Sequence, residues 1–265
     1  MSGLFKPQNK ILGADFAGTI EAVGRNIRQF HSGDEVYGCR QGSFSEFMCC
    51  REDRLAMKPI NVSFEQAAAA PMAALTALQA LRDIGRIQSG HKVLINGAGG
   101  GVGTFAVQIA KSFGAEVTAV CSTRNLEMAL SIGADHVVDY TKEDFTKSGQ
   151  RYDLILGANG YHSLFDYKRA LGPKGIYVMS GGTNAQMFQA FLGPLVSFGS
   201  GRRLAGVAAK VVQKDLVFIT ELLEAGKVVP VIDRRYRLNQ VPDAIRYLEE
   251  GHAQGKVVIT MRDRV

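Results

Sequence analysis

Residues 93–108 read VLINGAGGGVGTFAVQ, and this stretch decides the fold. A strand-like apolar run leads into five glycines within seven residues, and a helix-forming run follows directly. Glycine allows a sharp turn, lets the backbone approach a pyrophosphate and lets the helix pack closely on the strand. The amide N–H groups at the start of that helix would point at the anion.

The dinucleotide fingerprint Gly-x-Gly-x-x-Gly fits this stretch with Ala98 in place of the first glycine, followed by Gly100 and Gly103. The flanking strand and helix supply the context that such a fingerprint requires. We therefore expect a phosphate-binding loop. The alternative is a tight strand-to-helix turn that holds no ligand.

The chain around this loop alternates strands and helices. Short runs rich in Val, Ile and Leu predict strands at 92–96, 116–121, 136–139, 153–158, 175–179 and 203–207, and helices at 101–113, 125–132, 161–171 and 186–196. Apolar strands of this kind are typical of a parallel sheet covered by helices on both faces. The fold class is therefore α/β, with a Rossmann-type doubly wound sheet.

The segments on either side of this alternating region have a different pattern. Residues 11–54 look like β structure, including an alternating run at 43–48, and residues 63–81 look helical with a break at Pro71. After the last strand of the large sheet we expect helix 214–225, strand 228–238, helix 241–250 and strand 256–261.

The segment after the second predicted strand bears on the choice of dinucleotide. An NAD site places an Asp or Glu there for the ribose 2′-hydroxyl, but residues 122–125 read STRN, and the nearest carboxylate, Glu127, lies inside the next helix. Hydroxyls and a guanidinium suit the 2′-phosphate of NADPH. Helix capping with a solvated Arg124 is the alternative, and both can hold at once. The missing carboxylate also argues against S-adenosylmethionine.

Composition excludes several classes. The chain has 265 residues, 46% hydrophobic and 21% charged, and its net charge of +6 is not gathered into the basic stripe of a nucleic-acid binder. The longest run without polar side chains, residues 67–75, is too short to span a bilayer, and no secretory signal is visible at the N-terminus. The four cysteines show no Cys-x-x-Cys spacing. We expect reduced thiols and a cytoplasmic location.

Several further motifs carry a family resemblance. They are GADFAG (13–18), GDEVYG (33–38), GSFSEF (42–47), ALTA (74–77), the glycine loop, GADHVVDY (133–140) and GKVVI (255–259). In this order and spacing the chain resembles the medium-chain dehydrogenase/reductase superfamily, on its zinc-free, quinone-oxidoreductase-like side.

The resemblance implies a domain organisation. A GroES-like catalytic domain at 1–74 would be interrupted by a Rossmann domain at 75–227 and completed by residues 228–265. Family members carry additional β segments before the GADFAG stretch, so we expect a catalytic domain truncated at its N-terminus, with Met1 an internal methionine of a longer parent. The resemblance also implies a small-molecule substrate and a homodimer formed near 204–207.

The resemblance implies no metal. Zinc-binding members have a His at the position of Ala14, and a second ligand, a Cys, falls near Met72. A structural zinc would need four cysteines just before Gly42, where this chain has only Cys39. Neither Ala nor Met supplies a donor that zinc prefers.

Transferred residue by residue, the resemblance implies a set of cofactor contacts. They are Gly99, Gly100, Gly101, Val102 and Gly103 at the pyrophosphate; Ser122, Arg124 and Tyr140 at the 2′-phosphate; Asn159 near the adenosine; and Ser180, Gly181 and Thr76 toward the nicotinamide. Tyr140 could instead be an ordinary half-buried aromatic, and residues 180–182 a plain turn.

The expected activity is hydride transfer from NADPH to a quinone or an α,β-unsaturated carbonyl, without zinc. The chemistry would reside in the cofactor, and the protein would orient the reactants and exclude water. No Tyr-x-x-x-Lys pair exists, and no side chain is assigned as proton donor. The alternative is an impaired fragment or isoform that binds NADPH as a regulatory module.

Overall fold

The computed structural model describes residues 11–159, 162–181 and 201–261. The chain divides into two compact units. Unit 1 comprises Met1–Leu75, Lys210–Gly226 and Pro230–Val265; unit 2 comprises Thr76–Ala209 and Lys227–Val229. Each unit is described by itself below.

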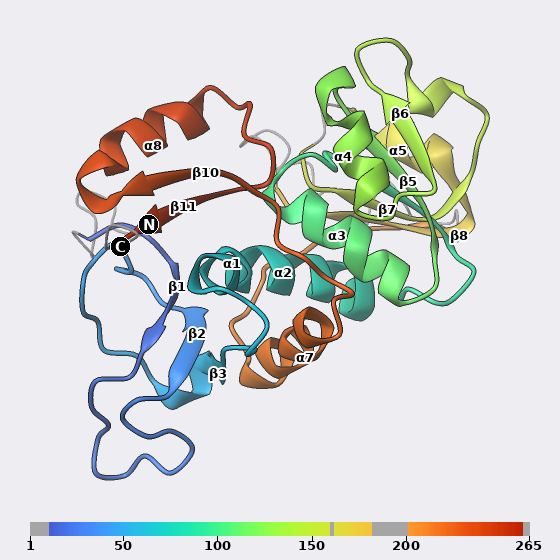
Figure 1. The fold of residues 1–265 in the computed structure, drawn as a ribbon. Helices are drawn as coiled ribbons and strands as arrows, with labels where there is room; N and C mark the ends of the chain where they lie inside the picture. Colours follow the sequence, from blue (N-terminus) through green and yellow to red (C-terminus); the bar gives the residue numbers. More distant parts are fainter. Residues whose placement is uncertain (1–10, 160–161, 182–200, 262–265) are drawn as a thin grey trace, which may run out of the picture. The chain divides into compact units, whose positions relative to one another are not determined.

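Unit 2 is built on a six-stranded parallel sheet (Figure 1). Its strands are β4 (Lys92–Asn96), β5 (Glu116–Cys121), β6 (His136–Asp139), β7 (Tyr152–Gly157), β8 (Leu171–Met179) and β9 (Arg203–Gly206). Their spatial order is β6-β5-β4-β7-β8-β9, so the chain reverses its direction of winding between β4 and β7. This is the doubly wound Rossmann order, in which ligands bind beyond the carboxyl ends of the strands at the reversal.

Helices pack against this sheet. They are α3 (Gly101–Ser112), α4 (Leu126–Ser131) and α5 (Leu164–Ala170). Helix α3 packs on β4 and β5, α4 on β5 and β6, and α5 on β8. The predicted helix at 186–196 lies outside the described residues.

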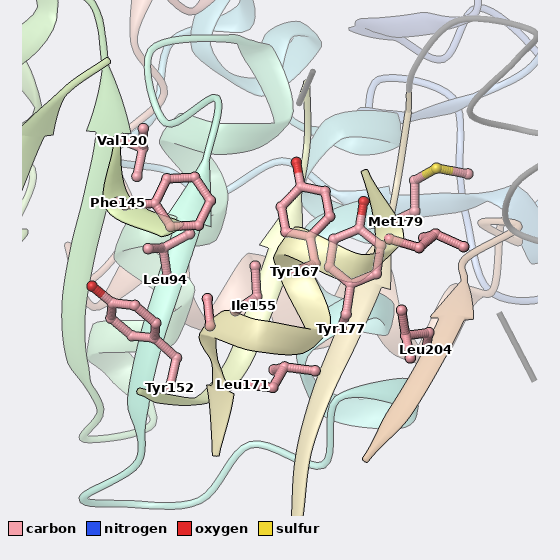
Figure 2. Packing of buried hydrophobic residues seen from close by; sticks show 12 residues of the cluster. Leu94, Val120, Phe145, Tyr152, Ile155, Tyr167, Leu171, Tyr177, Met179 and Leu204 are labelled. Atoms are coloured by element: carbon pink, nitrogen blue, oxygen red, sulfur yellow. The ribbon is translucent and has the colours of Figure 1, made fainter. Parts of the chain in front are cut away.

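The core of unit 2 joins side chains from most strands of the sheet (Figure 2). Tyr167 of α5 stacks on Tyr177 of β8 with ring centroids 4.1 Å apart. The Tyr167 hydroxyl accepts a hydrogen bond from Asn96 Nδ2 at 2.8 Å, so the last residue of β4 is tied to α5. This contact fixes the end of the strand from which the glycine loop departs.

Unit 1 contains two small sheets. Strands β1 (Asp15–Thr19), β2 (Glu35–Cys39) and β3 (Leu55–Met57) are antiparallel, and β10 (Ile232–Arg237) pairs in parallel with β11 (Lys256–Thr260) through the crossover helix α8 (Val241–Glu249). Helix α1 (Phe64–Ala69) opens with a capping box between Ser63 and Gln66. Helix α2 (Pro71–Leu78) follows, and its first residue is the predicted break at Pro71.

Helix α7 (Gln213–Glu224) belongs to unit 1 by its contacts. The buried Tyr37 hydroxyl donates to the Leu216 carbonyl at 2.9 Å, and it lies 3.0 Å from Thr220 Oγ1. The sequence prediction placed this helix in the Rossmann domain, whose boundaries at 75 and 227 stay a prediction.

The short helical turns are η1 (Glu52–Arg54), η2 (Gln79–Ile84, π-helical), η3 (Thr123–Asn125), η4 (Phe145–Lys147) and η5 (Leu238–Gln240).

One predicted strand is wrong. Residues 43–48 alternate polar and apolar side chains, but they form no strand, and the backbone bends at residues 44–46. Gly42 has a φ of +93°, and the Ser45 hydroxyl donates to the Gly42 carbonyl at 3.0 Å. The backbone therefore turns where the alternation predicted extension.

Candidate functional site

The glycine loop connects β4 to α3 through a turn that only glycine adopts easily. Gly97 has a φ of +89°, and a Cβ added there would lie 2.8 Å from the Asn159 amide nitrogen. A Cβ at Gly103 would lie 2.1 Å from the Gly97 carbonyl oxygen. Gly97 and Gly103 are therefore required by the fold, because the first turn of α3 packs directly on the loop.

Gly100 has a different environment. It is the N-cap of α3 with extended dihedrals (φ −89°, ψ 178°), which any residue can adopt. Among the described residues, a Cβ added to it would meet only the Gly97 carbonyl oxygen, at 3.6 Å. The fold does not demand glycine here, so its absent side chain keeps open the approach to the helix.

The N-terminus of α3 has no side-chain cap. The first amide N–H groups of a helix lack intrahelical acceptors, and they carry the positive end of the helix dipole. At Gly101, Val102 and Gly103 these groups follow a glycine N-cap that leaves room for an anion. This arrangement fits a pyrophosphate, whose oxygens would accept the amide hydrogens.

The neighbouring strand ends bring Ser122 and Tyr140 to the same edge of the sheet. The Tyr140 amide donates to the Cys121 carbonyl at 3.1 Å, so the end of β6 lies beside the end of β5. The Tyr140 side chain is exposed, as is Arg124 in η3. Three predicted contacts of the 2′-phosphate therefore lie on adjacent segments.

Asp139 is a carboxylate that the sequence argument missed. It ends β6, is buried, and accepts hydrogen bonds from the Thr123 hydroxyl at 2.5 Å and from the Thr141 amide and hydroxyl at 3.0 and 2.7 Å. The hydrogen bonds from Thr123 and Thr141 lower the pKa of Asp139 to about 2. The carboxylate thus anchors the 122–125 segment.

The sequence prediction considered carboxylates only at the end of β5 and in the helix that follows it. Asp139 instead comes from β6, which pairs with β5, so its distance along the chain hides how near it lies to residues 122–125. The motif VVDYT at 137–141 contained the signal, since a hydroxyl two residues after an Asp at a strand end is typical of a local side-chain turn.

The other predicted contacts lie at the ends of β7 and β8 and in α2. The Asn159 amide donates to the Asn96 carbonyl at 3.3 Å, and the Ser180 amide donates to the Gly157 carbonyl at 3.0 Å. A Cβ on Gly181 would lie 3.1 Å from the Ala158 carbonyl oxygen. Thr76 is buried within α2, away from the strand ends in sequence. All site assignments stay proposals.

In unit 1, the structure brings together the two positions at which zinc ligands were considered. The Met72 amide donates to Asp15 Oδ1 at 3.0 Å, and Ala14 directly precedes Asp15. Burial raises the pKa of the Asp15 carboxyl, while Lys256, 3.5 Å away, acts in the opposite direction. Within the described ranges, no group of three or more His, Cys, Asp or Glu side chains could hold a metal ion. The absence of a metal stays a prediction.

Comparison with known proteins extends these observations. Residues 1–76 match the family described as alcohol dehydrogenase GroES-like domain, and residues 132–259 match the family described as zinc-binding dehydrogenase. The Bos taurus protein NAD(P)H oxidoreductase RTN4IP1, mitochondrial, is 34% identical over 282 residues, covering 94% of this chain and 70% of the relative.

Two further proteins are similar over most of the chain. The Arabidopsis thaliana NADPH-dependent alkenal/one oxidoreductase, chloroplastic, is 34% identical over 267 residues, covering 96% of this chain and 64% of the relative. The solved structure of the quinone oxidoreductase from Coxiella burnetii has a TM-score of 0.83 at 30% identity, covering 95% of this chain and 79% of that one.

The names of these relatives correct one expectation. The predicted cytoplasmic location is wrong on this comparison, because similar proteins are named as mitochondrial and chloroplastic. The expectation rested on reduced thiols, which do not separate the cytosol from other compartments in which thiols stay reduced. Among the helices of the described residues, none has the length and apolar character needed to cross a bilayer.

Proposed function

The chain belongs to the medium-chain dehydrogenase/reductase superfamily, in its zinc-free, quinone-oxidoreductase-like branch, and on that premise we propose that it reduces a quinone or an α,β-unsaturated carbonyl with NADPH. Oxidoreductase activity with a nicotinamide cofactor follows from the family. The choice of NADPH and the substrate class are the proposal. Relatives named for quinone and for alkenal/one substrates support that class.

One observation carries the proposal above the others: the open, glycine-lined N-terminus of α3. Gly100 has space where other residues would carry a side chain, although its backbone does not need glycine. A ligand explains that space, whereas a plain turn does not. A pyrophosphate fits because the uncapped amides donate hydrogen bonds and the helix dipole favours negative charge.

The preference for NADPH rests on the segment after β5. Arg124 is exposed and adjacent to the hydroxyl-bearing Ser122 and Thr123. A guanidinium and hydroxyls bind a phosphate well. The carboxylate of Asp139 is engaged by Thr123 and Thr141, so it holds the turn in place. We propose that Ser122, Arg124 and Tyr140 bind the 2′-phosphate.

The protein's contribution to the reaction is binding and orientation. When bound, NADPH supplies the hydride for the electron-poor carbon of the acceptor. Gly99 to Gly103 would fix the pyrophosphate, and the ends of β7 and β8, with Asn159 and Ser180, would direct the cofactor along the edge of the sheet. Such fixation converts binding energy into alignment of the reacting atoms.

A steady-state assay tests this proposal. NADPH oxidation should accelerate on adding a quinone or an enone, and the apparent affinity for NADPH should exceed that for NADH. Arg124→Ala should lower the affinity for NADPH by at least about tenfold, because a charge-assisted contact to the phosphate is lost. The affinity for NADH should change little. Equal affinities of the unsubstituted chain for NADPH and NADH would contradict the 2′-phosphate assignment. NADPH binding without turnover of either acceptor class would favour the regulatory-module alternative.

A further inference from the structure

Asn125 is a buried polar residue whose side-chain acceptor has no partner in the part of the chain that the structure describes. It ends the η3 turn after β5, and the residue is only 7% exposed. Its amide nitrogen Nδ2 lies 3.3 Å from Ser122 Oγ as a hydrogen-bond donor. Its oxygen Oδ1 is buried and finds no hydrogen-bond partner within residues 11–159, 162–181 and 201–261. Buried acceptors in folded proteins are nearly always satisfied, so the unpaired oxygen points to a ligand.

The Asn125 side chain lies directly against the glycine loop. A Cβ added to Gly99 would be 2.3 Å from Asn125 Nδ2 and 2.9 Å from its Cγ. The carboxamide therefore fills the space beside Gly99 that a side chain there would occupy. It touches the phosphate loop on one side and Ser122 on the other.

The covalent structure of the cofactor identifies the group that belongs between these segments. In NADPH the adenosine ribose carries the pyrophosphate on its 5′ carbon and the phosphate on its 2′ carbon. If the glycine loop binds the first and the 122–124 segment the second, the ribose lies between them, beside Asn125. This step rests on the proposed function.

We propose that Asn125 Oδ1 accepts a hydrogen bond from the 3′-hydroxyl of the adenosine ribose. Nδ2 is engaged with Ser122, so the open atom is an acceptor, which matches a hydroxyl and not a phosphate oxygen. The 3′-hydroxyl is the ribose donor that NADPH and NADH share. Many dinucleotide sites use a carboxylate for the ribose; a neutral carboxamide does so without repelling a neighbouring 2′-phosphate.

Calorimetric binding of NADPH and of NADH to Asn125→Ala and Asn125→Leu tests the assignment. Both affinities should fall by a similar factor, about tenfold for one lost hydrogen bond to a buried acceptor. The melting temperature without cofactor should fall only slightly, because among the described residues the side chain loses one hydrogen bond, the 3.3 Å contact from Nδ2 to Ser122, and none from Oδ1. Alanine is smaller than asparagine, whereas leucine is similar in size but apolar. A loss of affinity in both variants therefore reflects the missing acceptor and not the size of the new side chain.

Asn125→Asp and Ser122→Ala are the matched controls. Asn125→Asp keeps an acceptor but adds charge, so NADH binding should be retained and NADPH binding should fall by at least about tenfold. Ser122→Ala should lower the affinity for NADPH and leave the affinity for NADH nearly unchanged.

Three results would overturn the assignment. Unchanged affinities with a lowered melting temperature would make Asn125 a structural residue only. Loss of NADPH affinity alone in Asn125→Ala would mean that it acts through Ser122. If the wild-type chain binds neither cofactor, the proposed function and this assignment fail together. If the wild-type chain binds and the Asn125 variants bind equally well, only this assignment fails.

Discussion

Two glycines of one loop, Gly100 and Gly103, serve different purposes although they are three residues apart. A Cβ at Gly103 would collide with the Gly97 carbonyl oxygen at 2.1 Å, whereas one at Gly100 would reach its nearest contact at 3.6 Å. The fingerprint therefore mixes glycines needed for folding with a glycine that a ligand needs. Only substitution separates the two roles.

We expect Gly103→Ala to destabilise the protein by about 1–3 kcal/mol, the usual cost of forcing an extra carbon into a packed site. Gly100→Ala should leave stability nearly unchanged, since its dihedrals suit alanine and its Cβ finds space. Thermal unfolding of both variants without cofactor measures the difference. Equal melting temperatures for the two variants would show that the loop does not pack as described.

At this scale, the sequence revealed the motif but not every residue in it. The fingerprint alignment put Ala98 in the first glycine position, yet the turn is made by Gly97, whose φ is +89°. From the sequence, Asn125 was only one of three residues, with Ser122 and Thr123, that could cap the next helix, and Asp139 was not a site candidate. Both depend on how a turn or a neighbouring strand presents the side chain, which residue spacing along a single strand cannot show.

The elements of unit 2 were more predictable. Strands β4, β5 and β6 match their predicted bounds, because short Val- and Ile-rich runs between glycine-containing turns have few other solutions. Strand β8 begins at Leu171, four residues before the prediction, and it passes through Pro173 where its register with β7 is irregular. The irregular pairing there accommodates a proline, which has no backbone N–H to donate to the ladder.

The β5–β6 strand ends contribute to the acid dependence of stability through Asp139. The folded pKa of Asp139 is about 2, below the ordinary value of 3.8. Asp139 therefore stabilises the fold at pH values above about 4, and this contribution is lost as the pH falls toward 2. Asn at this position keeps the shape but does not titrate.

Asp139→Asn should consequently be less stable than wild type at neutral pH, and the gap should close between about pH 4 and pH 2. Urea unfolding midpoints for both proteins across that range provide the measurement. A gap that stays constant with pH would mean that the charge of Asp139 contributes nothing to the fold.

At the scale of the whole molecule, β9 forms one edge of the six-stranded sheet. An edge strand presents unpaired backbone groups that can join a second copy of the chain. We propose a homodimer through β9, near residues 204–207. Light scattering after size exclusion should then give twice the chain mass of 28.7 kDa at micromolar concentration. A single-chain mass under the same conditions would refute it.

The two compact units have unequal sequence signals. Unit 2 can be predicted from the glycine loop and from the regular alternation of strands and helices. Unit 1, by contrast, is assembled from three separate segments of the chain. Its assembly depends on long-range contacts such as Tyr37 with Leu216, which local pattern does not encode. The prediction of unit 1 therefore came from family resemblance rather than from periodicity.

The central claim is that the N-terminus of α3 binds the pyrophosphate of a nicotinamide dinucleotide. Calorimetric titration of NADPH into the wild-type chain and into Gly100→Val tests it most directly, since a branched side chain there enters the ligand's space but not the protein's. The account predicts saturable one-to-one binding to wild type and none detectable to a folded Gly100→Val. No binding to wild type, or equal binding to both, would contradict it.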